Sequence, residues 1–490
     1  SGAVLAYSSI VTDKTAYTAG GAIKVTVTLK DSYENLVGGQ RDAINQAIQL
    51  PNTKAESIAW NEDQKGIYTA TYTALLPGTG LKAQLQMSGW ASALSSNDYS
   101  ISGDAASAQI VAMQVTTGNP DVLANGSDRH TVNVRVEDQF GNVLPEQTVT
   151  FTVTKGAAVF ANAGQSADIR TDAHGMAEVD LSSTVADAST VEAKINQSSD
   201  SKTVNFVADV STAQVAELVV TQDGSVADGS TANMLRVRVT DVFGNVLAGQ
   251  TVSVTADNGA TVAPVVITGP DGTVEISVTS QTAGTSAVTA SINNSSLSRN
   301  VTFVADVRTA KIADLVVTRD NSVADGAMAN TLRVRVTDAF GNTLAGQTVS
   351  VLADNSATVS PTVTTEPDGT VEISVTSQTA GVSTVTASIN SSSLIRNVTF
   401  VADVRTAQIA SLEVMQDNAI ADGAMANTLR ARVTDAFGNA LAGQTVSVTA
   451  GNGATVAPVV TTQPDGTVEI SVTSQTAGVS AVTATINSST

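Results

Sequence analysis

Histidine is the first residue type to examine for chemistry, because an imidazole can act as a general base or bind a metal near neutral pH. The chain contains two histidines, His130 and His174. Repeats described below carry Asn233 where the chain has His130, and Asp271 where it has His174. One isolated histidine at a strand end does not suggest a Ser-His-Asp arrangement. We therefore predict that both are surface residues and that the chain is not an enzyme.

Carboxylates near the starts of the repeats are the second candidate. Asp306 opens a short linker and is followed by Asp320 and Asp325, and the neighbouring repeats carry the same arrangement at Asp209, Asp223 and Asp228 and at Asp403, Asp417 and Asp422. Ca²⁺ prefers oxygen ligands, so a calcium site that stiffens a domain junction is one hypothesis. The alternative is a solvated acidic surface with Asx turns, because the spacing matches no EF-hand loop. No other metal and no cofactor is expected.

Aromatic residues are distributed unevenly. Trp60, Trp90 and all six tyrosines lie in the first 107 residues, whereas all nine phenylalanines follow them. Exposed Trp and Tyr side chains are frequent anchors in interfaces, so Trp60 and Trp90 are candidate ligand-binding residues. Core packing, the commoner fate of Trp in a β-sandwich, is the alternative.

Internal repeats define the organisation of the chain. The tripeptide Phe-Gly-Asn begins at Phe140, Phe243, Phe340 and Phe437, with a weaker form at Tyr33. We predict five units, at residues 1–107, 108–212, 213–309, 310–406 and 407–490. Four-residue linkers led by Asp104, Asp209, Asp306 and Asp403 precede the later units. Such short linkers leave neighbouring units little room to swing, which favours a semi-rigid rod.

Alternation of apolar and polar residues predicts strands. Leu235, Val237 and Val239 alternate with polar residues, a pattern typical of half-buried strands. The third unit has about seven such candidates, at 218–221, 235–239, 251–256, 263–268, 274–278, 286–292 and 300–305. This is the size of an immunoglobulin-like sandwich. The predicted fold class is all-β: tandem immunoglobulin-like β-sandwich domains that form an elongated rod.

Two units depart from the common pattern. In the first, residues 41–50 have weak helical spacing and are followed by Pro51, so one helical turn is an option there. The fifth stops at Thr490, before the strand that carries Phe303 and Phe400 in its sister units. An unpaired edge and an apolar gap should follow, so we expect this unit to be the least stable.

Composition excludes several classes of partner. The net charge of −20 repels nucleic acids and anionic lipid surfaces, so neither is expected as a partner. The absence of Cys removes disulfides, thiolate metal sites and cysteine nucleophiles. The chain opens with Ser1-Gly2 and no leader, which we interpret as a mature or excised piece of a larger protein.

The repeat resembles a known family. From Val226 to Val252 the chain reads Val-Ala-Asp-Gly, then Leu-Arg-Val-Arg-Val-Thr-Asp-Val-Phe-Gly-Asn-Val-Leu-Ala-Gly-Gln-Thr-Val. This pattern is similar to the group-1 bacterial immunoglobulin-like repeats of the intimin/invasin family, in which such repeats form the passenger of inverse autotransporters. The resemblance covers units two to five plainly and unit one loosely.

The resemblance implies a function. It implies an extracellular passenger segment of an outer-membrane adhesin, located on the bacterial cell surface, which attaches to a host cell-surface or extracellular-matrix protein or glycan and acts as a stalk. It implies membrane attachment only through a β-barrel that this chain lacks, and we expect a monomer. Receptor-binding residues of relatives have no matching positions here. A purely structural spacer and a glycan-binding surface array are the alternatives.

Overall fold

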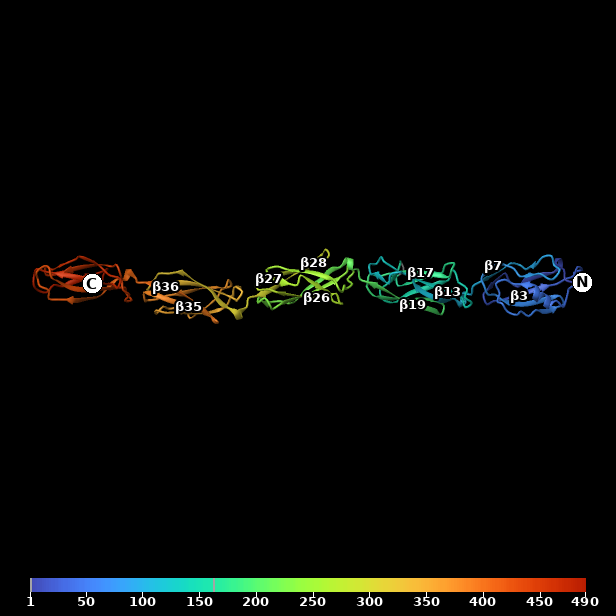
Figure 1. Ribbon diagram of the computed structural model, residues 1–490, viewed down its shortest axis with the longest axis horizontal. Coiled ribbons are helices and arrows are strands. Elements are labelled where there is room, and N and C mark those ends of the chain that lie inside the picture. Colours follow the sequence, from blue (N-terminus) through green and yellow to red (C-terminus); the bar gives the residue numbers. More distant parts are fainter. Residues whose placement is uncertain (1, 162–163) are drawn as a thin grey trace.

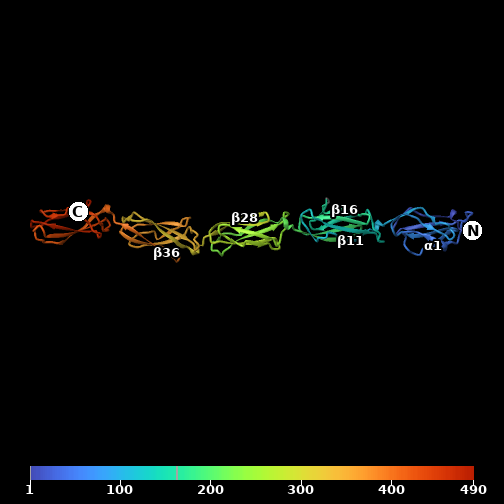
Figure 2. The same ribbon diagram turned by 45° about the horizontal axis from the view of Figure 1, so that its top comes forward.

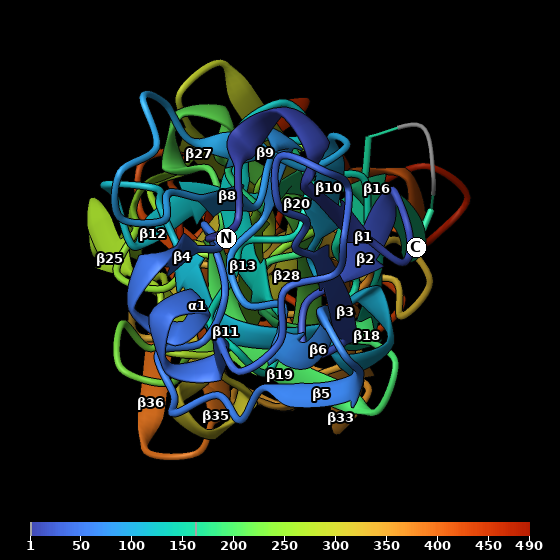
Figure 3. The same ribbon diagram turned by 90° about the vertical axis from the view of Figure 1, so that its right-hand side faces the viewer.

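The chain forms a row of five β-sandwiches joined end to end. The computed structural model describes residues 2–161 and 164–490, and its two ends lie at opposite tips of the row (Figure 1). The row is also straight in a view turned by 45° about its long axis (Figure 2). Viewed down the long axis, the five sandwiches lie one behind another (Figure 3). The molecule is an elongated, mostly β rod of tandem sandwiches, which confirms the predicted architecture.

The third sandwich shows how the sequence forms this unit. Leu235, Val237 and Val239 on β22 are fully buried, whereas the arginines between them are exposed, because successive side chains of a strand face opposite sides of the sheet. Val252 on β23 and Phe303 on β28 belong to the same core although they lie on the other sheet. The sheet orders are β20-β22-β26-β24 and β21-β28-β27-β23-β25.

The bounds of its strands differ from the prediction at a few places. The strands are β20 Gln214–Gln222, β21 Ser225–Val226, β22 Asn233–Thr240, β23 Thr251–Ala256, β24 Thr261–Val262, β25 Val265–Ile267, β26 Thr273–Thr279, β27 Gly284–Ile292 and β28 Ser295–Val304. β21 and β24 have two residues each, too few to show an alternation. β28 begins five residues earlier than predicted, because Asn293 adopts a φ of +51° in a tight turn and Ser295 pairs with Ile292.

The second and fourth sandwiches repeat this arrangement. The second contains β11 Gln109–Val115, β12 Asp121–Leu123, β13 His130–Glu137, β14 Thr148–Lys155, β15 Val159–Phe160, β16 Ser166–Arg170, β17 Met176–Ser182, β18 Ala188–Ile195 and β19 Ser198–Val207. The fourth contains β29 Lys311–Arg319, β30 Ser322–Val323, β31 Asn330–Thr337, β32 Thr348–Ala353, β33 Thr362–Thr364, β34 Thr370–Val375, β35 Gly381–Ile389 and β36 Ser392–Val401. In each, a short strand pairs in parallel with the last strand: β12 with β19, and β30 with β36.

The first sandwich has the same general architecture with additional elements. It contains η1 Leu5–Tyr7, β1 Ser9–Thr12, β2 Ala16–Thr18, β3 Ala22–Thr28, α1 Arg41–Ala47, β4 Ile48–Gln49, β5 Asn61–Gln64, β6 Ile67–Thr73, β7 Gly78–Leu81, β8 Gln84–Leu85, β9 Leu94–Ser95 and β10 Tyr99–Ser102. The helical turn in residues 41–50 is confirmed. Ile44 anchors α1 in the core with no exposed surface. No helix within the described residues has the length and apolarity needed to cross a membrane.

The fifth sandwich is more open than its neighbours. It contains β37 Gln408–Gln416, β38 Ala426–Thr434, β39 Thr445–Ala450, β40 Thr455–Val456, β41 Val459–Thr461, β42 Thr467–Thr473 and β43 Val482–Thr485. Within the described residues, its second sheet has three strands where the third and fourth sandwiches have five. Leu412 is half-buried there, whereas the corresponding Leu315 of the fourth sandwich has no exposed surface. Its lower stability remains a prediction.

Candidate functional site

The structure contradicts the prediction that His130 is a surface residue. Its side chain is buried, its ring packs edge-on against Phe206 with 5.0 Å between centroids, and its Nε2 lies 2.8 Å from the carbonyl oxygen of Asn205. The corresponding Asn233 donates from Nδ2 to the carbonyl oxygen of Thr302 in the same way. Alignment of the repeats matched His130 with Asn233, but it did not show that these side chains face the core. His130 is the first residue of β13 and already lies on the buried face of that strand.

The second histidine is placed as predicted. His174 lies in an exposed turn, with Nδ1 3.8 Å from a carboxylate oxygen of Asp172. His130 lies in the core of the second sandwich and His174 lies in solvent, so the two histidines are in different environments.

The tryptophan candidates are held mainly by the first sandwich itself. Trp60 is 5% exposed and packs edge-on against Tyr72 in the core, so its ring cannot serve as an exposed anchor. Trp90 is half-buried, and its Nε1 donates to the carbonyl oxygen of Ala3 at 3.0 Å. Burial follows from the size and apolarity of the ring, which helps to fill a core that also contains Tyr68 and Tyr99.

The calcium candidates do not converge. Asp306 pairs with Arg308 at 3.0 Å in the linker before the fourth sandwich. Asp320 accepts a hydrogen bond from the backbone N–H of Thr399, and Asp325 accepts from two N–H groups of its own loop, near Arg405 in the next linker. Across residues 2–161 and 164–490, no group of three or more His, Cys, Asp or Glu side chains is placed to hold a metal ion.

The linkers instead form short, capped helices. Asp306 caps η4 Val307–Thr309 by accepting a hydrogen bond from the N–H of Arg308. The same cap precedes η2 Ala105–Ser107, η3 Val210–Thr212 and η5 Val404–Thr406. An Asp side chain at this position satisfies an N–H group that the helix leaves without a partner. The four linkers are therefore ordered turns.

One buried carboxylate connects each linker to the next sandwich. Asp338 has no exposed surface, and its Oδ1 accepts hydrogen bonds from the N–H groups of Phe340 and Asn342, both at 2.9 Å. Its Oδ2 accepts from the side-chain amide of Asn342 at 2.8 Å and from the N–H of Asp306 at 3.2 Å. We call this residue and its equivalents the hub aspartates: Asp138, Asp241, Asp338 and Asp435.

The asparagine of Phe-Gly-Asn reaches the preceding sandwich. Asn342 donates from Nδ2 to the carbonyl oxygen of Gln281 at 2.9 Å, and its Oδ1 accepts from the N–H of Ala283 at 2.7 Å. Asn245 and Asn439 make the same pair of bonds one junction earlier and one junction later. These residues, with Asn142, are the clamp asparagines.

The junction between the first and second sandwiches has a different set of contacts. Asn142 donates to the carbonyl oxygen of Leu75 at 2.8 Å, and the ring of Phe140 packs on Gly20. A side chain at Gly20 would meet Phe140 at 2.6 Å, and the φ of Gly20 is +81°, so both the close contact and the backbone conformation require glycine. The sequence analysis identified these turns but not their contact with the neighbouring sandwich, because the residues that they contact lie about 60 positions away in the sequence.

The charge of the hub is stabilised by its donors. Burial alone would raise the pKa of Asp138, but hydrogen bonds from the Asn142 side chain and from the N–H groups of Asp104, Asn142 and Phe140 lower it below 3.8. At the third junction, the Arg308 side chain is the main cause of the lowered pKa of Asp306. A lowered pKa favours the ionised form of Asp138 and Asp306, and the four acceptor sites of a carboxylate can bind several N–H groups at once. What this arrangement can do is hold two sandwiches in one orientation.

Comparison with known proteins identifies the family of these sandwiches. Residues 112–207, 215–304, 312–401 and 409–490 match the bacterial Ig-like domain (group 1). The chain belongs to this family. The matched segments are the second to fifth sandwiches. These are the sandwiches that contain the hub aspartates and the clamp asparagines.

A curated relative covers nearly the whole chain. The chain is 30% identical to the inverse autotransporter adhesin YeeJ of Escherichia coli over 98% of its length, and the aligned region is 21% of YeeJ. The chain thus spans about a fifth of the length of this curated relative.

Solved structures similar to this chain include those of two bacterial proteins. The crystal structure of invasin, a bacterial integrin-binding protein, is 22% identical, with a TM-score of 0.38 and 76% of each chain covered. The structure of FdeC, an Escherichia coli adhesin, is 17% identical, with a TM-score of 0.37, and covers 62% of this chain and 99% of its own. The repeat pattern alone had suggested FdeC as the particular relative, and this narrower assignment is not supported at such a distance.

Proposed function

We propose that the chain is a passenger segment of an inverse autotransporter adhesin, displayed on the surface of a Gram-negative bacterium. The observation that carries this proposal is the 30% identity to YeeJ over 98% of the chain. The function is attachment and reach, without catalysis, metal or cofactor.

The junctions support the role of a stalk. A hub aspartate and a clamp asparagine link each sandwich to the linker and to the sandwich before it. Three such hydrogen bonds at one junction restrict hinge motion far more than a four-residue linker alone would. A stalk that cannot fold back holds a distal binding region at a fixed distance from the cell.

The first sandwich is the best candidate for contact with a host target. The third, fourth and fifth sandwiches carry the identical segment at 270–284, 367–381 and 464–478, which favours a spacer role for these three. The first sandwich has its own composition and an exposed Tyr33, 80% accessible in the turn that corresponds to Phe-Gly-Asn. We propose a host cell-surface or matrix protein, or a glycan, as its partner, with the chain acting as a monomer.

The alternative is a purely structural spacer without a ligand site of its own. The observation that favours it is the burial of Trp60, which removes one of the two tryptophan anchors predicted from the sequence. The glycan-binding array has no comparable observation in its favour.

Surface display and adhesion can be tested together. The chain would be fused to the barrel of an inverse autotransporter, either complete or without residues 1–107, and display would be measured by antibody labelling and protease shaving. We expect both forms to be displayed, and binding to host cells, matrix proteins or glycans to require residues 1–107. Normal display with no binding by either form would favour the spacer, and failure of display would contradict the passenger assignment.

A further inference from the structure

Tension along the rod enters each sandwich at its first strand and leaves at its last. In the fourth sandwich the chain arrives from η4 at β29 and departs from β36, which ends two residues before Asp403 in the next linker. β29 and β36 belong to different sheets. Contacts other than a shared backbone ladder must therefore hold β36 to the first segment of the sandwich, residues 310–330.

The end of β36 is held by the short strand β30. Val323 lies opposite Val401 in this parallel pair, and the N–H of Ala324 donates to the carbonyl oxygen of Val401 at 2.8 Å. Phe400, the neighbour of Val401, is 1% exposed, so its ring anchors the same stretch of strand in the core. Separation of β30 from β36 therefore breaks backbone hydrogen bonds and exposes an aromatic ring.

Two polar side chains reinforce this pair. Asp320 accepts a hydrogen bond from the N–H of Thr399 at 2.6 Å, and Asn330 donates to the carbonyl oxygen of Thr399 at 2.9 Å. The Oδ1 of Asn330 also accepts from the N–H of Ser322 at 3.0 Å, so that one buried amide joins β30 to β36. We call the contacts that β30, Asp320 and Asn330 make with the end of β36 the strand lock.

The beginning of β36 is held as well. Asn390, in the turn before this strand, donates from Nδ2 to the carbonyl oxygen of Ala310 at 2.9 Å. The Oγ of Ser392 accepts from the N–H of Ile312 at 3.0 Å. Ala310 and Ile312 are at the point where the chain enters the sandwich. β36 is thus attached to the first segment near both of its ends.

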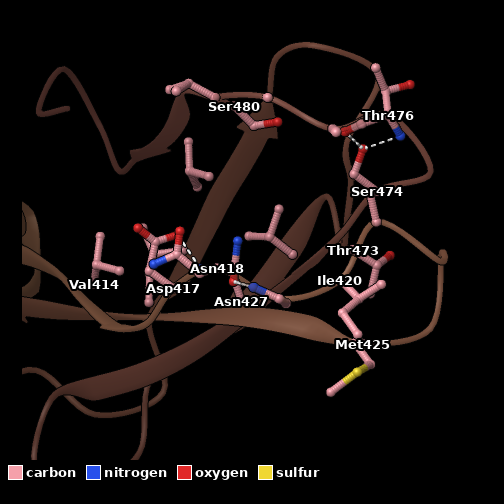
Figure 4. Close-up of a pocket in the computed structure, with 18 of the residues that line it drawn as sticks. Val414, Asp417, Asn418, Ile420, Met425, Asn427, Thr473, Ser474, Thr476 and Ser480 are labelled. Carbon is pink, nitrogen blue, oxygen red and sulfur yellow. Dashed lines mark hydrogen bonds between the residues drawn. The ribbon is translucent and has the colours of Figure 1, made fainter.

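The strand lock recurs along the rod. In the third sandwich Asp223 and Asn233 bind the backbone of Thr302, beside the parallel pair of β21 with β28. In the second, β12 and β19 form a parallel pair of three residues. Figure 4 shows the equivalent side chains of the fifth sandwich, Asp417 and Asn427, on the wall of a groove. Tension meets the same type of contact in the second, third and fourth sandwiches.

The geometry of the strand lock determines how it responds to tension. The strands run along the rod (Figure 1), so a pull on its two ends draws β30 and β36 in opposite directions along their own axes. Hydrogen bonds between strands lie across this direction and are therefore loaded together. Bonds of a hairpin that is pulled apart at its open end break one after another. Forced unfolding is governed by the rate of this first rupture and not by equilibrium stability.

We propose that the chain bears tension, and that the strand lock is the contact that resists it in the second, third and fourth sandwiches. The proposed function supplies the source of the tension, because a stalk fixed to a cell at one end and to a target at the other is stretched when the cell is pulled. The strand lock keeps the sandwiches folded under this load and so preserves the length of the stalk.

Stretching of the fourth sandwich within the whole chain tests the proposal. Val307 and Val404 lie in the flanking linkers and are 56% and 55% exposed, and the native chain has no Cys. Val307→Cys and Val404→Cys would carry the handles for optical tweezers, and the dwell time before unfolding would be measured at constant force. Asn330→Ala should shorten this dwell time roughly 5- to 10-fold, the effect of about one lost hydrogen bond.

A matched variant separates resistance to tension from ordinary stability. Thr365 is buried at the opposite edge of the sheet from β30, where its hydroxyl donates to the carbonyl oxygen of Leu344 at 2.7 Å and accepts from the N–H of Gln347 at 2.9 Å. Thr365→Val should lower the melting temperature about as much as Asn330→Ala, but change the dwell time less than about 2-fold. Asp320→Ala removes one bond of the strand lock from an exposed side chain, and should also shorten the dwell time.

The direction of pulling is a further test. Val382, near the start of β35, is 54% exposed. Handles at Val382→Cys and Val404→Cys pull the hairpin of β35 and β36 apart from its open end, so that its bonds break in turn. We expect the sandwich to open at a lower force in this direction than when it is held at the two linkers.

Three results would overturn the proposal. Equal shortening of the dwell time by Asn330→Ala and Thr365→Val would mean that the strand lock contributes only ordinary stability. Unchanged dwell times in both Asn330→Ala and Asp320→Ala would place the resistance elsewhere. Equal forces in the two pulling directions would contradict the simultaneous loading of the bonds. All three measurements use the purified chain, so their outcome is independent of surface display and of binding to a host.

Discussion

At the scale of single residues, the clamp asparagines are the side chains on which the geometry of the rod depends. Asn342 uses both ends of its amide on the backbone of the preceding sandwich, at Gln281 and Ala283, and it also donates to Asp338. An amide is well suited to this task because it offers a donor and an acceptor in one rigid plane.

Replacement of Asn342 by Ala should loosen the third junction. The variant loses both bonds to the preceding sandwich, so we expect the distribution of distances between the two sandwiches to broaden. Spin labels at Ser253→Cys and Ser350→Cys would report it by pulsed dipolar spectroscopy, because the native chain has no Cys. Asn35→Ala, in the equivalent turn of the first sandwich, is the matched control and should change nothing. An unchanged distribution for Asn342→Ala would show that the clamp does not limit the junction.

His130 allows a second residue-scale prediction. His130→Asn should be tolerated, because the sister sandwiches use Asn to donate to the same strand. His130→Leu should destabilise the second sandwich by about 1 kcal/mol, since the hydrogen bond between the His130 ring and the carbonyl oxygen of Asn205 is lost. Calorimetry of the whole chain, with hydrogen exchange at β19 to assign the transition, measures both. Equal stability of the two variants would mean that this bond contributes little.

At the scale of elements, the linkers are capped helical turns rather than flexible tethers. Each has an Asp at its N-cap, and a hub aspartate accepts the N–H of that cap. Carboxylates thus replace the water that would otherwise solvate the backbone of an exposed linker.

Acid should weaken these elements. The hydrogen bonds at Asp138 and Asp306 lower the pKa of both carboxyl groups in the folded chain. A lowered folded pKa gives stability that is present above the ordinary value of 3.8 and is lost as the pH falls through the folded pKa. We expect the melting temperature to be nearly constant between about pH 7 and 5 and to decrease below about pH 4. A melting temperature that stayed constant to about pH 2 would contradict this assignment.

Calcium provides a separate test of the linkers. Asp306 is paired with Arg308, Asp320 and Asp325 each use Oδ1 to accept backbone N–H groups, and the three carboxylates do not form a group placed to hold a metal ion. We expect the same melting temperature in EDTA and in millimolar Ca²⁺. Occupation of a site at 100 times its dissociation constant would stabilise the chain by about 2.7 kcal/mol, a shift of several degrees that calorimetry would detect. Such a shift would restore the calcium hypothesis.

At the scale of the whole molecule, the repeated junctions extend the chain into a rod (Figure 1). A sandwich with strands of this length is roughly 35 to 45 Å long, so five of them should reach about 180 to 220 Å. Small-angle scattering measures this maximum dimension directly. A value near 80 Å, roughly that of a globular particle of this mass, would exclude the rod.

The sequence by itself determined the fold class, the repeats and most of the strands, because these rest on local patterns. Alternation at Leu235, Val237 and Val239 depends only on the geometry of one strand, and the Phe-Gly-Asn turn depends on a few neighbouring residues. Short strands such as β21 were not predicted, because two residues are too few to show the alternation of a strand.

Only the tertiary structure decided what crosses from one element to another. It placed His130 and Trp60 in cores, separated Asp306 from Asp320 and Asp325, and brought Asn342 to the preceding sandwich. It also showed that Asp417 and Asn427 face a groove. Each of these depends on backbone groups distant in the sequence, and the identity of a residue does not specify which distant carbonyl or N–H group will meet it in the folded chain.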